Sequence, residues 1–348
     1  MSLTKFKNFF LENILDFLWR QWSSLGVAGG SRPEEDWIID SEALLIFSLQ
    51  MARYEPRFFD EILDWLVING KFIDIQRLRG ITKKQDEPTR RLISAVASYL
   101  SHAAKANQRK WESLSLVYRA NPNTQDEALF KTKDGKPYPK IKAESPVFHN
   151  YGFLREDFVL RKMSKPVSAT APSNVRFLLR ALFGIGSRPE CILYLLMHEA
   201  GHPSEVAQAI GISVRGAQDT LIELAESGLV LTRVKGKRKI EYWLSQKKWW
   251  EFLLGANVED NPIWLNWIAL FIGLNNVWSV LNEAEKTESD YMRSSKLREA
   301  MESISLEFSK SGLAMPSIPG RDVRPEKYEV EFQNFVTKVL GARSGTSK

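Results

Sequence analysis

The chain has 348 residues, of which 44% are hydrophobic and 26% are charged. This composition is typical of globular proteins and excludes wholesale disorder and collagen-like repeats. Its 48 basic and 42 acidic residues give a formal net charge of +6, which is weak evidence for a polyanionic partner at this length. Cys191 is the only cysteine, so the sequence excludes an intrachain disulfide and a multi-cysteine metal site. We therefore expect a reducing, cytoplasmic setting.

The first half of the chain is predicted to be largely helical. No signal peptide is recognisable at its start. Asp40 is a good N-cap for a helix over residues 41–53, and Pro56 opens a second helix over residues 56–69. The alternation in residues 71–76 predicts a short strand, and residues 88–119 predict one long helix or two. The order helix, helix, strand suggests a degenerate winged-helix unit in this half.

Charge is distributed unevenly in the same half. Residues 34–74 carry ten acidic and three basic side chains, whereas residues 75–145 carry fifteen basic and seven acidic ones. We interpret the basic block as a solvated face, and the alternative is a second surface for an acidic partner. Prolines and small residues in segments 121–146 and 164–174 place a domain boundary near residue 170.

The last hundred residues are predicted to be helical and rich in tryptophan. The predicted helices cover residues 247–255, 262–285, 291–311 and 326–340. Residues 263–281 lack charge but contain three asparagines, which favours a buried or partner-facing helix over a membrane span. Trp264 and Trp267 are three residues apart, so we expect them to share a helix face. That aromatic face suits either a dimer interface or an ordinary core.

The most informative segment covers residues 187–245. An apolar helical run at residues 192–196 comes first, and Pro203 then begins a short helix that reaches Ile210. Gly211 makes a tight turn, and Ser213 is a suitable N-cap for a third helix that runs to about residue 227. Two β-type runs follow at residues 229–234 and 240–244, with a turn over residues 235–239 between them.

This ordered set resembles the winged helix-turn-helix DNA-binding domains of the MarR/ArsR type. Ala207 is small enough for close helix packing, Gly211 follows four positions later, and residues 226–230 read ESGLV, a frequent entry to the wing. The small core of the domain is supplied by Val206, Ile210, Ala217, Leu221 and Leu224. The resemblance implies a mainly α fold with a small β-wing. It also divides the chain into a helical region over residues 1–170, a DNA-binding domain over 171–250 and a helical, dimerising region over 251–348.

The resemblance further implies a transcriptional regulator that binds double-stranded DNA as a homodimer. From the residues themselves we expect no cofactor and no membrane contact. The third helix would enter the major groove. The side chains expected at base edges are Ser213, Arg215, Gln218 and Thr220. The side chains expected at phosphates are the wing residues Arg233, Lys235, Lys237, Arg238 and Lys239. Asp219 and Glu223 fit this interpretation less well, because carboxylates repel phosphate.

Two alternatives remain open. The winged helix can instead serve as a protein-interaction module, for example one that neutralises a partner enzyme. The second alternative is a zinc metallohydrolase, since residues 198–202 spell H-E-x-x-H, in which His198 and His202 would bind zinc. That chemistry needs both histidines on one continuous helix, and Gly201 followed by Pro203 argues against it.

Overall fold

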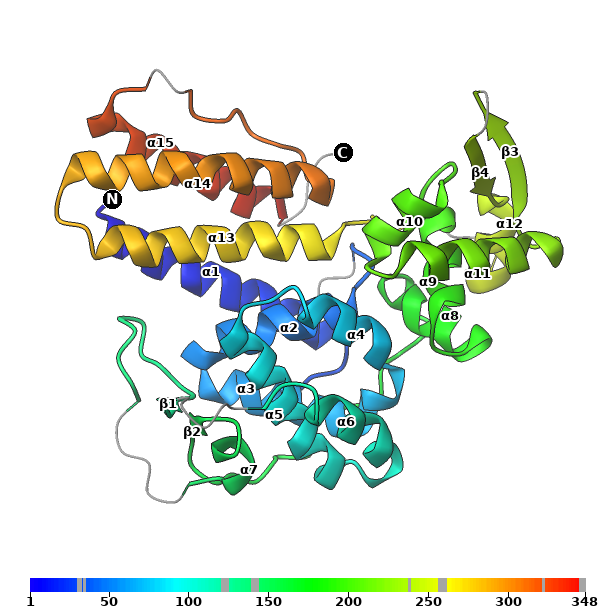
Figure 1. The fold of residues 1–348 in the computed structure, drawn as a ribbon, viewed down its shortest axis with the longest axis horizontal. Helices are drawn as coiled ribbons and strands as arrows, with labels where there is room; N and C mark the ends of the chain where they lie inside the picture. The colour runs from blue at the N-terminus through cyan, green and yellow to red at the C-terminus, as the bar shows by residue number, and fades with distance from the viewer. Residues whose placement is uncertain are drawn as a thin grey trace. The chain divides into compact units, whose positions relative to one another are not determined.

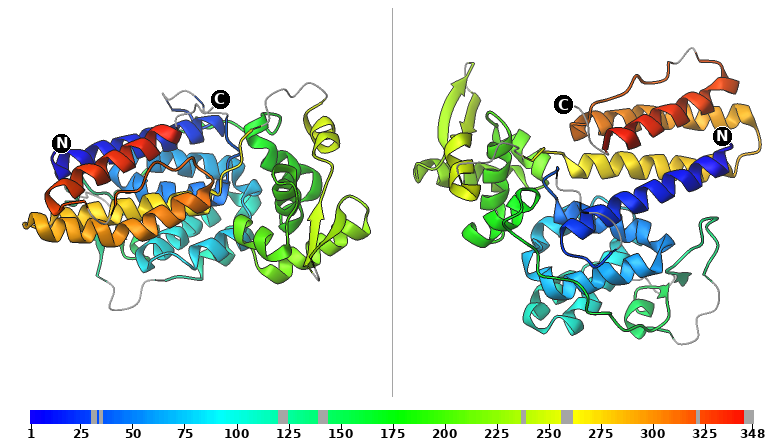
Figure 2. Two further views of the ribbon diagram at one scale, coloured as in Figure 1. Left: turned by 90° about the horizontal axis from the view of Figure 1, so that it is seen from above. Right: turned by 180° about the vertical axis from the view of Figure 1, so that it is seen from behind.

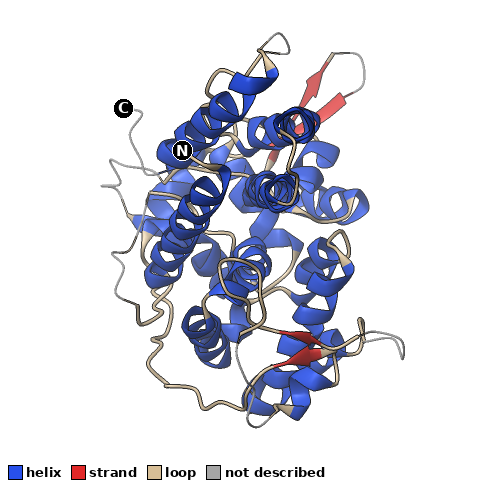
Figure 3. Ribbon diagram, turned by 90° about the vertical axis from the view of Figure 1, so that its left-hand side faces the viewer, coloured by secondary structure: helices blue, strands red, loops and turns tan. Residues whose placement is uncertain are grey.

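The computed structural model describes residues 1–29, 33, 36–119, 125–138, 144–236, 239–255, 262–320 and 323–343. Over these residues the protein is mainly helical, with fifteen α-helices and two small two-stranded sheets (Figures 1 and 3). The predicted fold class is confirmed at this level. Among the described helices none is long and apolar enough to cross a membrane. The chain divides into two compact units, one of Met1–Leu18 with Leu265–Lys348 and one of Trp19–Trp264.

The first unit is a group of long helices held together by aromatic side chains. It contains the first part of α1 (Leu3–Ser24), α13 (Trp267–Glu285), α14 (Asp290–Ser311) and α15 (Pro325–Arg343). Figure 2 shows α13 and α14 side by side and antiparallel. Phe10 stacks on Trp278 with ring centroids 6.3 Å apart, and Phe308 lies 6.3 Å from Phe335. The last three of these helices match predicted ones, whereas α1 was not predicted.

The prediction that Trp264 and Trp267 share a helix face is wrong. Helix α13 begins only at Trp267, because the Asn266 side chain accepts the N–H of Ala269 and caps the helix there. Trp267 stacks on Phe17 at 6.0 Å in the first unit. Trp264 precedes the helix and belongs to the second unit.

The second unit begins with five helices of the N-terminal half. They are α2 (Ser41–Met51), α3 (Pro56–Asn69), α4 (Ile75–Thr82), α5 (Glu87–Ala103) and α6 (Gln108–Ser115). Asp40 caps α2 as predicted, accepting the N–H of Ala43 at 3.1 Å. The predicted strand over residues 71–76 is wrong: a 3-10 turn covers Gly70–Phe72, and α4 follows it. Asp74 accepts the N–H of Arg77 and caps α4, so a local cap overrides the apolar alternation.

The described residues in the middle of this unit form only short helices and strands. Strands β1 (Glu127–Ala128) and β2 (Phe153–Leu154) pair in parallel, and helix α7 covers Pro146–His149. Helix α8 (Val175–Phe183) follows and leads through Gly184 and Gly186, which both have positive φ, into the next helix.

The unit ends with a three-helix and hairpin arrangement. The three helices are α9 (Ser187–Met197), α10 (Pro203–Ile210) and α11 (Val214–Glu226), and the hairpin is formed by β3 (Leu231–Lys235) and β4 (Lys239–Trp243). A fourth helix, α12 (Gln246–Leu254), follows the hairpin. Strands β3 and β4 are antiparallel, with Arg233 opposite Glu241. Gly201 exchanges two backbone hydrogen bonds of 2.9 Å with Tyr242, so the α9–α10 connection extends this sheet. The core between the helices contains the five predicted residues Val206, Ile210, Ala217, Leu221 and Leu224.

A buried network of six charged side chains joins α9 and α10 to the N-terminal helices. Its members are Asp40, Glu42, Arg77, Arg176, Arg180 and Glu190, each at most 6% exposed. Arg180 bonds to Glu42 at 2.7 Å and to Glu190 at 2.5 Å. Arg77 donates from Nε to the carbonyl oxygen of Ile210 at 2.6 Å. The three cations and three anions balance, and the network fixes α4 against the end of α10.

Candidate nucleic-acid interface

The turn between α10 and α11 has the geometry that its sequence predicts. Gly211 ends α10 in the left-handed region with φ 73°, where a glycine avoids the strain of a Cβ atom. Ser213 then caps α11 by accepting the N–H of Gly216 at 3.1 Å. Ala207 is 2% exposed on the buried side of α10. The two helices therefore meet through a short, fully capped turn.

Helix α11 presents three of the four predicted base-reading residues to solvent. Ser213, Arg215 and Gln218 are exposed, and the Arg215 side chain is 92% exposed. Thr220 is a correction to the predicted set: it is 5% exposed, and its hydroxyl lies 2.6 Å from that of Ser187. Helical periodicity places Thr220 on the core side of α11, away from the face that carries Arg215.

Acidic side chains lie on the exposed surface of α11 as well. Asp219 is 62% exposed, and its carboxylate is 3.7 Å from Arg215. Glu223 forms an ion pair of 2.9 Å with Arg188 of α9, outside α11. The cationic character of the exposed face therefore lies at its N-terminal end, around Arg215.

The basic residues of the β3–β4 hairpin that the structure describes are paired with glutamates. Arg233 bonds to Glu199 at 2.7 Å and to Glu241 at 3.1 Å. Lys235 lies 3.0 Å from Glu241. Arg233 and Lys235 are two of the five wing residues predicted to meet phosphate, and Lys237 and Arg238 lie outside the described residues.

The third described wing residue, Lys239, lies 2.6 Å from Glu205 at the start of α10. The hydrogen bond from Lys239 lowers the pKa of Glu205 below its ordinary value, so that carboxylate stays charged. Lys239 remains 43% exposed. The described hairpin cations are thus accessible but partly neutralised.

The two histidines of the H-E-x-x-H segment lie in different structural contexts. Helix α9 ends at Met197, and His198 is extended, with its ring stacked on Tyr194 at 4.0 Å and Nδ1 2.8 Å from the carbonyl oxygen of Tyr194. Burial lowers the pKa of His198. His202 caps α10 by accepting the N–H of Ser204 at 3.3 Å. The continuous helix that a zincin site requires is therefore missing from this segment.

Among the described residues, no group of three or more histidine, cysteine or carboxylate side chains is placed to hold a metal ion. Cys191 is buried in the core beside α10 and α11, and burial raises the pKa of its thiol to about 12. A thiol held in this form is a poor nucleophile and a poor metal ligand.

Sequence reasoning missed the glutamates that pair with the hairpin. Glu241 lies opposite Arg233 because the two residues are equally far in sequence from the middle of the hairpin turn. The acidic residue at this position of the second β-type run was therefore a signal for the pair. Glu205 lies in the first turn of α10, where an acidic residue interacts favourably with the helix dipole and gives no signal of a partner in the hairpin. The Gly201–Tyr242 pairing had no recognisable signal, since a single bridge needs no apolar alternation.

The comparisons with known proteins add no further assignment. No protein-family model matches the chain, and no similar curated protein or solved structure is found either.

Proposed function

We propose that residues 187–245 form a winged helix-turn-helix domain and that the protein is a DNA-binding transcriptional regulator. The observation that carries this proposal is the order of elements: three helices with a glycine turn before α11, then an antiparallel hairpin. The bridge from Gly201 to Tyr242 supports it, because it adds a third short strand between the first two helices of the domain. The fold alone does not define the function, so the exposed face of α11 supplies the second argument.

Helix α11 suits a major groove in length and in side chains. Its 13 residues span about 20 Å, and the groove is about 12 Å wide. Exposed Arg215 can donate two hydrogen bonds to the edge of guanine, and Gln218 can pair with adenine. The hairpin would lie along the phosphate backbone and contribute affinity rather than sequence preference. As a homodimer, the protein would contact half-sites about one helical turn apart.

Binding of the full chain to duplex DNA is the first expected result. Duplexes selected from a random pool should bind more tightly than an unselected duplex of the same length, as measured by fluorescence anisotropy. The logarithm of the association constant should fall linearly with the logarithm of salt concentration, by about 0.9 for each phosphate neutralised. An absence of binding to every duplex at low salt would contradict the proposal. Analytical ultracentrifugation with and without the duplex tests the dimer.

Removing the glutamate that neutralises Lys239 should strengthen this binding. In Glu205→Gln the amide can still accept the N–H of His202, which the carboxylate accepts at 3.2 Å, so the start of α10 is preserved. Lys239 would be released to a phosphate, and we expect affinity to rise about three- to tenfold at low salt. The matched control is Glu307→Gln, which removes the same charge from the 2.6 Å pair with Lys310 in the other unit. Equal effects of the two substitutions would show that only net charge matters.

A second candidate function, protein docking through the hairpin, is favoured by one observation. Val234 and Ile240 lie opposite each other near the hairpin tip and are 72% and 48% exposed. Exposed apolar pairs of this kind suit a protein surface better than a phosphate backbone. A partner that co-purifies in stoichiometric amount, and is lost with Val234→Ser, would support this candidate over DNA binding.

A further inference from the structure

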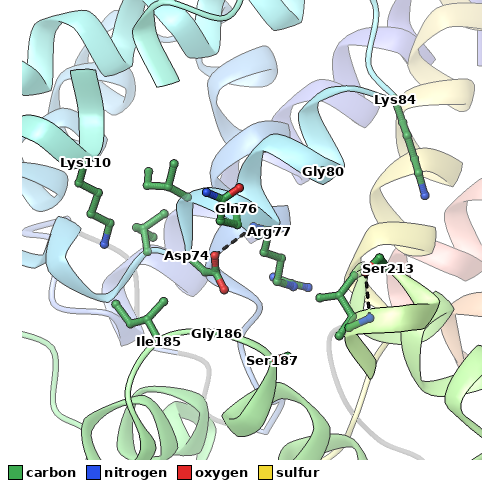
Figure 4. Close-up of a pocket in the computed structure, with 15 residues that line it drawn as sticks. Asp74, Gln76, Arg77, Gly80, Lys84, Lys110, Ile185, Gly186, Ser187 and Ser213 are labelled. Carbon is green, nitrogen blue, oxygen red and sulfur yellow. Dashed lines mark hydrogen bonds between the residues drawn. The ribbon is translucent and has the colours of Figure 1, made fainter. Parts of the chain in front are cut away.

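A cavity of about 800 Å³ lies beside the turn between α10 and α11 (Figure 4). Its lining comes from α4, α6, the start of α9 and the start of α11. Cavities of this volume are common for small-molecule ligands. Four isoleucines contribute apolar wall, namely Ile73, Ile75, Ile185 and Ile212. Ile185 is 43% exposed, so apolar surface faces this space without a protein neighbour to cover it.

Two lysines give the cavity lining an excess of positive charge. Figure 4 shows Lys110 of α6 on one side, and Lys84, just after α4, on the other side with Ser213. In the part of the chain that the structure describes, neither ammonium group forms an ion pair. Lys110 donates instead to the carbonyl oxygens of Gly70 at 3.0 Å and Lys71 at 2.8 Å.

The other charged groups in the lining offset the charge of these lysines only in part. Arg77 is already balanced by the carboxylates of Asp40 and Glu42. Asp74 is the one carboxylate among the lining residues, and it is held as the N-cap of α4, accepting the N–H of Arg77 at 3.0 Å. Burial lowers the pKa of Lys110 to about 8, although the carboxylates of Glu42 and Asp74 act in the opposite direction. A ligand that brings negative charge would relieve this cost.

Two helix N-termini border the same space and favour the same sign of ligand. Gly186 and Ser187 begin α9, and no side chain caps this helix. Ser213 is the N-cap of α11 and accepts the N–H of Gly216, so this helix end contributes its dipole rather than that N–H group. The positive end of a helix dipole and its free N–H groups bind phosphate in many proteins.

We propose that this cavity binds a small organic phosphate, and that its occupation changes the DNA affinity of α11; the second half of this proposal rests on the proposed function. The ligand's phosphate lies with Lys84 and the start of α11, and its apolar body lies against the isoleucines. On the opposite side of the cavity, Lys110 donates to a second acceptor group of the ligand. Because Arg77 bonds to the carbonyl oxygen of Ile210, a shift of α4 on binding moves the end of α10 directly.

Calorimetric titration of the free full-length protein with ADP tests the binding step without any DNA. Adenosine serves as the uncharged control and inorganic pyrophosphate as the control without an apolar body. We expect ADP to bind more tightly than either. Lys84→Gln should weaken ADP about tenfold, since a charge-assisted hydrogen bond is lost. Lys83→Gln is the matched control, because Lys83 is an exposed neighbour outside the lining.

Each outcome bears on one half of the proposal. No ADP binding at millimolar concentration, or equal losses in Lys84→Gln and Lys83→Gln, would overturn the site. ADP binding that leaves the affinity for a selected duplex unchanged would keep the site and overturn its link to α11. A protein that binds ADP but no DNA would contradict the proposed function and leave the site supported.

Discussion

Replacing Arg180 with alanine is expected to lower the free energy of unfolding by about 3–5 kcal/mol. The guanidinium is fully buried between Glu42 and Glu190, and it also donates to the carbonyl oxygen of Phe72 at 2.6 Å. Without it, both carboxylates lose a cation while they remain out of reach of water. Each carboxylate keeps one other arginine of the network, but the network is left with one excess buried negative charge, which costs several kcal/mol. This substitution should therefore have the largest effect on stability.

The pKa of Glu42 predicts how the contribution of the same network to stability depends on pH. Burial raises this pKa, but Arg180 and Arg77 outweigh it and hold the pKa at about 2, below the ordinary 4.5. A carboxyl group with a depressed pKa contributes stability that is present above its unfolded pKa and lost as the pH falls through the folded one. The wild-type protein should therefore lose this contribution between about pH 4.5 and pH 2, and the Arg180→Ala variant should lose less.

Urea unfolding of the full chain, followed by circular dichroism at neutral pH, measures the effect of Arg180→Ala. Arg180→Lys keeps the charge but loses the forked geometry, and it should fall between wild type and alanine. Lys310→Ala is the control, because it breaks a partly exposed pair with Glu307 and should cost less than about 1 kcal/mol. A loss for Arg180→Ala no larger than for Lys310→Ala would show that the network contributes little.

The elements that the sequence predicted best are those fixed by neighbouring residues. Asp40, Pro203 and Ser213 act within three or four positions, so the starts of α2, α10 and α11 follow from them alone. The prediction of a short strand at residues 71–76 was wrong because of such a local effect, since Asp74 caps a helix there. Local capping therefore outweighs apolar alternation when the two conflict over a few residues.

Long-range contacts were beyond such reasoning. The partners in the buried network lie far apart in the chain, as Arg180 and Glu42 are separated by 138 positions. A basic residue in a helix has the same local pattern whether it is solvated or buried opposite an acid. Thr220 is a different case: it was assigned to the exposed face, although its helical spacing from Ala217 already indicated the core side, where its hydroxyl contacts Ser187. Exposure on α11 is set by packing against α9.

Substitution of the exposed polar residues of α11 is expected to have the largest effect on DNA binding. If Arg215 and Gln218 contact bases, each alanine variant should lose about 1–3 kcal/mol of binding free energy, or about five- to 150-fold in affinity. Because both side chains are exposed, the fold should be unaffected, which circular dichroism can verify. Anisotropy on a duplex selected with the wild-type protein measures the loss.

The decisive readout is sequence preference rather than affinity alone. Removing a base contact should flatten the preference at one or two positions of the selected duplex, whereas removing a phosphate contact weakens all duplexes alike. Lys286 is an exposed lysine of the other unit. Lys286→Ala removes the same charge as Arg215→Ala and should leave the sequence preference and the affinity for DNA nearly unchanged. Should Arg215→Ala and Gln218→Ala both bind every duplex as the wild-type protein does, α11 is not inserted in the major groove. The exposed Val234–Ile240 pair would then make protein docking the better explanation of the same fold.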